Sequence, residues 1–316
     1  MVVLGCAVPV GPAFADDSEE RLFVFKDPRI TESSGLAVSP TLDDVYYTHN
    51  DSAAGPVFFA VDGEGKTKAT YTVAGAEARD WEAMAASKDP ETGKGVLWFA
   101  DIGDNFDGAW PDVSVYRVME PTDLRGGTVR ATRYRFRYED GGRNAEGIMV
   151  NPDGRLYVVS KEFSGGVYEA PKRLRAGKTN ILRKVGPAPI MATDAAFAPD
   201  GSSFVIRTYF SATLYSGVGK QLARVSMPQL DQAESITYTR DGKALLTGSE
   251  GAHSPVYRVP LPERAQPVAA TPSPPSPTKA SVEEPRGGLS GTDILVWLAA
   301  AVAAIGAITF IARRTR

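Results

Sequence analysis

The chain has 316 residues, of which 43% are hydrophobic and 23% are charged, values that are ordinary for a globular protein. Its formal net charge is −3, and the sequence contains neither a basic stripe nor a glycine-rich phosphate loop. We therefore expect no nucleic-acid partner. The length allows one large domain with additional segments at its ends.

The N-terminus resembles an export signal. Residues 1–15 are apolar and end in Ala-Phe-Ala at 13–15, which is the pattern of a signal peptide and its cleavage site. No basic region precedes the run, which leaves open a start further upstream, and residues 3–6 (Val-Leu-Gly-Cys) offer lipoprotein cleavage as an alternative. Cys6 is the single cysteine, so cleavage after Ala15 leaves neither a cysteine nucleophile nor a cysteine zinc ligand.

One stretch occurs twice without a gap, at residues 144–162 and 232–250. Each copy reads as an acidic residue, a short strand, an Asp-Gly turn and a second strand, which is the pattern of a β-hairpin. Three looser copies occur elsewhere, and the leading acids of the five repeats are 50, 64, 48 and 40 residues apart. A β-rich unit of this period is typical of propeller blades. The five leading acids are Glu32, Glu82, Glu146, Asp194 and Glu234.

The predicted strands begin at residues 20–26, ahead of the first repeat. The first four repeats each contain four strand-like runs, and the fifth contains three. The N-terminal strand is the natural fourth strand of the fifth repeat, because pairing the two chain ends closes the ring without an exposed edge. The sequence therefore predicts an all-β fold, a five-bladed β-propeller over residues 16–261. Six blades are the alternative, if the long second repeat hides an extra one. The strands of the repeats are predicted at residues 35–38, 45–48, 57–61, 69–73, 83–86, 96–100, 113–118, 133–138, 148–150, 156–159, 166–170, 181–185, 195–198, 204–207, 213–216, 221–225, 236–238, 244–247 and 256–259.

The composition changes after the last repeat. Residues 262–292 are rich in Pro, Ala and Ser, as in a disordered linker. Residues 293–312 include a run of 19 residues without a charge, at 294–312, which is about 28 Å long as a helix and suits a transmembrane span. Three arginines lie in the final segment, residues 313–316, and predict a cytoplasmic tail. We expect a single-pass protein of the cell membrane with its propeller on the extracellular side.

A binding site is predicted at one mouth of the propeller channel. The innermost strand of each blade lines the channel, and the leading acids lie where the chain enters these strands. The second strands run antiparallel and end in polar residues near the same mouth, so the two sets of side chains should converge. The candidate ligand-binding residues are Glu32, Asn50, Glu82, Asp104, Asn105, Glu146, Glu162, Asp194, Arg207, Glu234 and Glu250.

Carboxylates that share one site repel each other unless a cation or a basic partner compensates them. Calcium suits such a group, because it takes six to eight oxygen ligands in flexible geometry. The candidate metal ligands are Glu82, Asp101, Asp104 and Glu146, and calcium is the only cofactor we expect. Alternatively, the acids accept backbone N–H bonds and pair with the basic side chains of Lys161, Arg207 and Arg79.

Several short motifs carry a resemblance to known proteins. They are Asp80-Trp81-Glu82, Asp101-Ile102-Gly103-Asp104-Asn105, Val115-Tyr116-Arg117, Glu120-Pro121, Ala145-Glu146-Gly147 and Ala233-Glu234-Ser235. The chain resembles a group of secreted, membrane-anchored β-propeller proteins of high-GC Gram-positive bacteria that has no assigned activity. It is more distantly similar to calcium-dependent propeller enzymes of the phytase and lactonase types. The resemblance covers roughly residues 20–262 and implies the fold, but the basic phosphate site of phytases is not recognisable and the lactonase histidine has no clear counterpart.

Three functions remain open at this stage. The expected function is that of a cell-surface-anchored propeller that binds an extracellular ligand or protein at the acidic mouth, with calcium. The first alternative is a calcium-dependent hydrolase of the phosphoesterase or lactonase type. The second is a structural protein-interaction platform whose channel acids are internal. The sequence contains no Gly-x-Ser-x-Gly motif that would indicate a serine hydrolase.

Overall fold

The computed structural model describes residues 19–51, 54–106 and 108–266. In this part of the chain there are 20 β-strands and one short 3₁₀ turn, Glu263–Ala265, so the fold is all-β. The same residues contain no helix that is long and apolar enough to cross a membrane. The expected signal peptide, the transmembrane span and nearly all of the linker lie outside the described residues.

The strands pair with their sequence neighbours into antiparallel sets of four. Set 1 contains β2 (Ser33–Val38), β3 (Tyr46–Asn50), β4 (Val57–Val61) and β5 (Thr67–Ala74). Set 2 contains β6 (Trp81–Lys88), β7 (Gly95–Asp101), β8 (Val113–Met119) and β9 (Gly127–Tyr138). Set 3 contains β10 (Ala145–Val150), β11 (Leu156–Ser160), β12 (Gly166–Glu169) and β13 (Thr179–Pro187). Set 4 contains β14 (Ala192–Phe197), β15 (Phe204–Thr208), β16 (Ser211–Gly217) and β17 (Lys220–Ser226).

The fifth set joins the two ends of the described chain. Its order is β18 (Ser235–Tyr238), β19 (Ala244–Gly248), β20 (Pro255–Pro260) and β1 (Glu20–Val24). The N-terminal strand β1 pairs antiparallel with β20, as the sequence predicts. Phe23 of β1 and Phe25 directly after this strand are buried in one apolar cluster with Leu246 and Val256 of set 5. Apolar burial and backbone hydrogen bonds therefore both hold the N-terminal strand in place.

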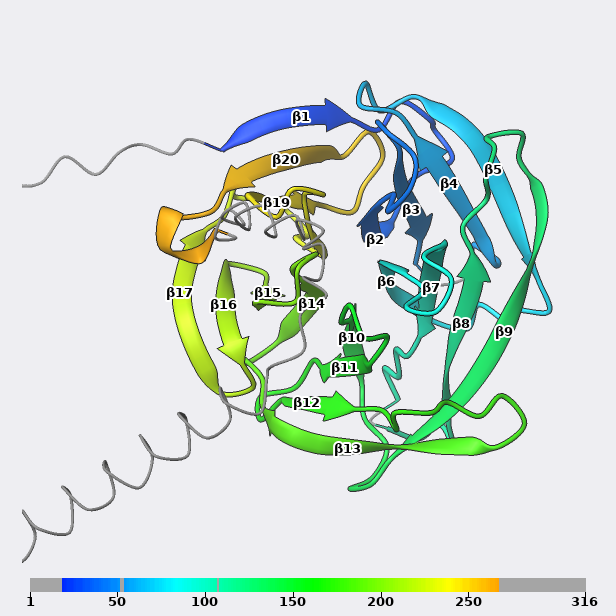
Figure 1. Ribbon diagram of the computed structural model, residues 1–316, viewed down its shortest axis with the longest axis vertical. Coiled ribbons are helices and arrows are strands. Elements are labelled where there is room, and N and C mark those ends of the chain that lie inside the picture. Colours follow the sequence, from blue (N-terminus) through cyan, green and yellow to red (C-terminus); the bar gives the residue numbers. More distant parts are fainter. Residues whose placement is uncertain (1–18, 52–53, 107, 267–316) are drawn as a thin grey trace, which may run out of the picture. The chain divides into compact units, whose positions relative to one another are not determined.

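The first strand of each set, here called its inner strand, lies toward the common centre (Figure 1). The inner strands contact one another in the cyclic order β2, β6, β10, β14 and β18, and β18 contacts β2 again. This arrangement is β-propeller-like. The Asp-Gly turns between inner and second strands form as expected, with positive φ angles of 77° at Gly154, 72° at Gly201 and 68° at Gly242.

The long strand β9 connects three of the sets at their outer edges. Its first residues pair in parallel with β5, from Tyr71 opposite Gly127 to Ala74 opposite Arg130. Its last residues pair in parallel with β13, from Thr179 opposite Arg135 to Leu182 opposite Tyr138. Sets 1, 2 and 3 thereby form a continuous 12-stranded sheet, whereas sets 4 and 5 are separate four-stranded sheets in the described residues.

Candidate functional site at the acidic mouth

A β-bulge at the start of four inner strands determines which side chains reach the channel mouth. The register skips one residue there, at Ser34 in β2, Glu82 in β6, Glu146 in β10 and Thr193 in β14. A bulge turns one side chain away from the regular alternation of the strand. In set 5, Glu234 occupies the corresponding place, directly before Ser235, which pairs with Gly248.

Two of the five predicted leading acids, Glu32 and Asp194, therefore do not occupy the bulge position. Glu32 is exposed and lies two residues before the bulge, where Ser34 takes the equivalent position. Asp194 lies one residue after the bulge at Thr193 and is fully buried. Its carboxylate accepts backbone N–H bonds from Ala195 (2.7 Å) and Ile236 (2.8 Å), so it joins set 4 to set 5.

Three carboxylates come together in a group that could hold a metal ion. Asp51 follows β3, Asp80 directly precedes β6, and Glu82 is the bulge residue of β6. One oxygen of each lies within 4.8 Å of the others. Asp80 and Glu82 are 7% and 5% exposed, and Asp51 is half-buried. The structure therefore places one of the four predicted metal residues, Glu82, beside two carboxylates that the sequence analysis did not select.

Gly103 lies against two of these carboxylates. A Cβ atom at this position would lie 2.2 Å from Glu82 Oε1 and 2.4 Å from Asp80 Oδ2. No side chain fits there unless the carboxylates move. The close approach of the backbone lets the two acids converge.

Asp101 positions the segment that carries Asp80. Its Oδ1 accepts hydrogen bonds from the backbone N–H groups of Arg79 (3.1 Å) and Asp80 (2.9 Å), and its Oδ2 lies 3.4 Å from the Arg79 guanidinium. Burial raises the pKa of Asp101, and these hydrogen bonds together with the positive charge of Arg79 act in the opposite direction. Both carboxylate oxygens of Asp101, a predicted metal ligand, therefore already have partners on residues 79 and 80.

Asp104 and Asn105 organise the loop that follows β7. Asp104 accepts backbone N–H bonds from Phe106 (3.2 Å) and Trp110 (2.8 Å) and is 1% exposed. Asn105 is exposed and donates a long bond of 3.5 Å to Asp80 Oδ2. Asn105 therefore touches the metal-compatible group, whereas Asp104 shapes the loop beside it.

A second pair of charges lies in the neighbouring set. Lys161 Nζ lies 2.6 Å from Glu146 Oε1, and both side chains are largely buried. The same ammonium lies 4.9 Å from the centre of the Tyr209 ring. Glu146 thus has a basic partner, as the alternative interpretation expects.

The carboxyl groups around this opening influence one another. We call the set of Asp51, Asp80, Glu82, Glu146, Glu234 and Glu250 the acidic mouth. Burial, and then the negative charge of Glu146 and Asp51, raises the pKa of Glu82 well above its usual range. Burial and neighbouring carboxylates raise the pKa of Asp80 to about 6 and that of Glu250 to about 7. At neutral pH the acidic mouth therefore retains protons or takes up a cation.

The other candidate residues have structural contacts. Asn50 accepts backbone bonds from Thr31 and Glu32 through its side-chain oxygen, and so fixes the chain entering β2. Glu162 accepts bonds from Arg143 (3.0 Å) and Ser160 (2.9 Å). Arg207 is fully buried; its Nε donates to the Ala233 carbonyl at 3.3 Å, and its terminal nitrogens have no hydrogen-bond partner within the described residues.

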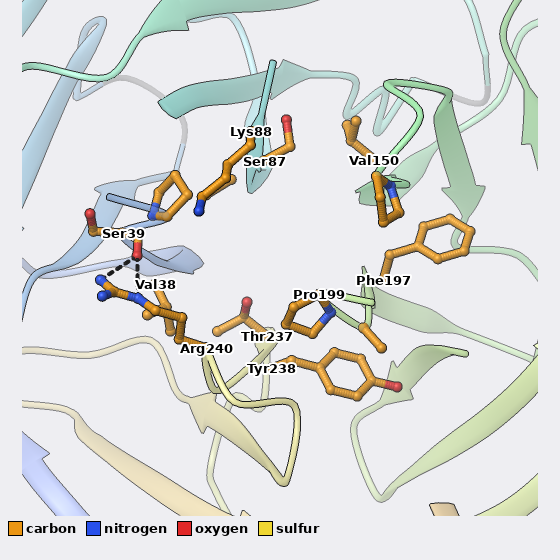
Figure 2. Close-up of a pocket in the computed structure, with 14 residues that line it drawn as sticks. Val38, Ser39, Ser87, Lys88, Val150, Phe197, Pro199, Thr237, Tyr238 and Arg240 are labelled. Atoms are coloured by element: carbon orange, nitrogen blue, oxygen red, sulfur yellow. Dashed lines mark hydrogen bonds between the residues drawn. The ribbon is translucent and has the colours of Figure 1, made fainter. Parts of the chain in front are cut away.

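The opposite ends of the inner strands form a different kind of opening. A pocket of about 320 Å³ there is lined by residues from all five sets. Figure 2 shows the Lys88 side chain pointing into it, with Arg240 bonded to the Ser39 carbonyl. Two cationic residues and no carboxylate line this pocket. The concentration of negative charge thus belongs to one mouth of the channel.

No protein-family model matches this chain, and no curated protein sequence matches it. Among solved structures, it is similar to the PQQ-bound form of aldose sugar dehydrogenase (Adh) from Streptomyces coelicolor, with a TM-score of 0.45 and 11% sequence identity. That match covers 76% of this chain and 97% of the other. The similarity concerns the fold alone.

Proposed function

We propose that this chain contains a five-bladed β-propeller that binds calcium and an extracellular ligand or protein at its acidic mouth. The five antiparallel sets, the cyclic contacts of the inner strands and the pairing of β1 with β20 support the blade count and the ring closure. The alternative of six blades would require another set of strands, and the described residues form five sets.

The observation that carries the proposal is the convergence of the Asp51, Asp80 and Glu82 oxygens within 4.8 Å. The donors are all carboxylate oxygens, which favour hard cations over zinc or copper. Calcium accepts additional ligands in flexible geometry, so main-chain carbonyls, water and oxygens of a bound partner could complete its shell. Burial and then repulsion between the carboxylates raise the pKa of Asp80 and Glu82, and a cation would compensate that repulsion.

Binding the cation should release protons. Asp80 has a pKa of about 6, so part of it is protonated at mildly acidic pH, and Glu82 retains its proton over a wider range. Calcium needs both in the ionised form, and calcium affinity should therefore rise with pH. The test is calorimetric titration of the purified chain with calcium in buffers of different ionisation enthalpy. A single site with pH-dependent proton release supports the proposal, whereas no calcium heat at any pH would overturn it.

The state of His49, which lies two residues before Asp51, favours the binding role over a hydrolase that would use this histidine. His49 is fully buried, lies edge-on to Trp81 at 5.5 Å, and packs against Phe99. Burial lowers the pKa of His49 to about 4. A histidine enclosed in this way cannot meet a substrate as a general base.

We also propose that the propeller is anchored outside the cell by a single C-terminal span. The support is the sequence pattern of residues 1–15 and 262–316, which includes the charge-free run at 294–312 and the terminal arginines. Protease added to intact protoplasts should release the propeller by cutting within residues 262–292. A propeller that stays protected from the protease would refute this orientation.

A further inference from the structure

Three phenylalanines protrude beside the acidic mouth. Phe106, Phe163 and Phe210 are 71%, 85% and 89% exposed. Each lies in the loop between the second and third strands of consecutive sets: β7–β8, β11–β12 and β15–β16. Large apolar side chains at such exposure are normally scattered singly, and their recurrence in equivalent loops indicates an interaction surface.

Short links along the chain tie these rings to the charged groups of the mouth. Phe163 lies two residues after Lys161, which binds Glu146. Phe210 directly follows Tyr209, whose ring lies near the Lys161 ammonium. Phe106 directly follows Asn105, which bonds to Asp80. The three apolar side chains therefore stand on the same mouth as the carboxylates.

Hydrogen bonds at their bases fix two of the loops. The backbone N–H of Phe106 donates to Asp104 (3.2 Å), and that of Phe210 donates to Thr208 Oγ1 (3.3 Å). The loops are thus shaped independently of the exposed rings.

Two hollows separate the protruding side chains. One of about 370 Å³ is lined by Asn105, Lys161, Phe163 and Met191 among others. The other, of about 610 Å³, includes Ile190, Met191 and Phe210. Met191, which contributes to both, has a φ of 53° and donates its N–H to the Glu162 carbonyl (3.1 Å). Such a backbone conformation is unusual for methionine, and strain of this kind is found at binding sites.

We propose that Phe106, Phe163, Phe210 and Ile190 form, with the acidic mouth, one docking surface for a protein segment in which a lysine or arginine is flanked by apolar side chains. The basic side chain pairs with Glu234 and Glu250, the carboxylates of the acidic mouth that neither hold the cation nor form the ion pair with Lys161, and the apolar neighbours fill the two hollows. This inference rests on the proposed use of the mouth as a binding site. Charge complementarity decides the occupant, because the same carboxylates repel an anionic membrane surface.

The test is a selection of random dodecapeptides displayed on phage against the full chain in calcium. The selected peptides should contain Lys or Arg next to aromatic or aliphatic residues. The double variant Phe163→Ser/Phe210→Ser should bind them at least tenfold more weakly, and added salt should weaken binding to the unaltered protein. The matched control is Leu222→Ser, which removes a 43% exposed leucine from the outer strand β17 and should leave the affinity unchanged.

Other outcomes overturn the inference. They are enrichment of acidic peptides, no enrichment, or equal binding to the double variant and the unaltered protein. Binding to vesicles of phosphatidylcholine and phosphatidylglycerol that needs Phe163 and Phe210, without peptide enrichment, would replace the protein partner by a membrane. Calorimetric titration with calcium alone tests the cation site separately from the docking surface. If the chain binds no calcium but still binds peptides in a way that requires Phe163 and Phe210, the cation site is refuted and the docking surface is supported.

Discussion

The substitution Glu82→Gln separates a metal role of the acidic mouth from a purely structural one. Glu82 is 5% exposed, and its pKa is raised by burial and by Glu146 and Asp51. Without a cation it therefore carries its proton at neutral pH, and glutamine closely matches protonated glutamate in shape. At an effective dielectric constant near 20, two ionised carboxylates 4.8 Å apart would repel by about 3.5 kcal/mol, and by more at shorter separations, which adds to burial in keeping Glu82 protonated. In chelator, the variant should be as stable as the unaltered protein or more stable.

In calcium, the unaltered protein should be more stable than Glu82→Gln. A cation that binds only the folded state stabilises it by about 2.7 kcal/mol at a hundredfold excess over Kd. For a domain of this size, that corresponds to a rise in Tm of about 5–10 °C. Glu82→Gln removes one of the three ligands and should abolish most of this rise.

The assay is differential scanning calorimetry of both proteins in calcium and in EDTA. Glu64→Gln makes the same chemical change at an exposed position of the β4–β5 turn and serves as the control. An equal calcium response in the variant and the unaltered protein would place the site elsewhere. If the unaltered protein melts at one temperature in both solutions, the acids are structural, and the calcium-dependent hydrolase loses its basis as well.

Three further predictions test the surroundings. Gly103→Ala should lower the calcium affinity measured by calorimetric titration at least tenfold, because the alanine methyl group would occupy the space of the Glu82 and Asp80 oxygens. A calcium affinity equal to that of the unaltered protein would show that the ion binds elsewhere. In chelator, the free energy of unfolding should fall as pH rises through about 7, because the folded-state pKa of Glu250 lies above its unfolded value and the stabilisation present below about pH 4 is lost when the group ionises. Urea titrations at several pH values measure this dependence, and Glu250→Gln should make it less steep. An equally steep dependence in the variant would assign it to other groups. Phe25→Ala should lower the free energy of unfolding by about 3–5 kcal/mol, since Phe25 is fully buried beside the pairing of β1 with β20, whereas a loss below about 1 kcal/mol would contradict the importance of ring closure.

The sequence predicted part of every strand of the described domain, because apolar alternation and Asp-Gly turns are local signals. It missed residues 127–132, the first half of β9, where the strand pairs with β5 of another set. Loop conformation is not local in this sense. Matching the looser repeats on their acidic residues selects Glu32 and Asp194, yet the bulge falls on Ser34 and Thr193. Counting back six residues from the proline, as from Pro152 to Glu146, gives Ser34 from Pro40 and Thr193 from Pro199, so this spacing is the signal that could have found the bulge. The direction of a side chain at a bulge depends on where the register slips.

The metal-compatible group was only partly foreseeable for a related reason. Glu82 was selected from its place in the repeat. Asp51 and Asp80 lie in loops, and their oxygens meet only because Asp101 bonds to the backbone of residues 79 and 80 and because Gly103 leaves space. The Asp80-Trp81-Glu82 and Asp101-Ile102-Gly103-Asp104 motifs were visible in the sequence, but not which acid in them would bond to backbone and which would face the opening.

The parallel pairing of β9 with β5 and β13 has a consequence for how the ring opens. Sets 1, 2 and 3 share a continuous backbone hydrogen-bond network, whereas sets 4 and 5 contact their neighbours mainly through side chains in the described residues. The first three sets should therefore lose their structure as one cooperative unit, and local opening should begin at the borders of set 4. Backbone amides of β16 and β17 would then exchange with solvent deuterium faster than those of β8 and β9. The docking loop that carries Phe210 belongs to that more readily opened part, so occupancy of the acidic mouth should slow amide exchange in set 4 more than in any other set.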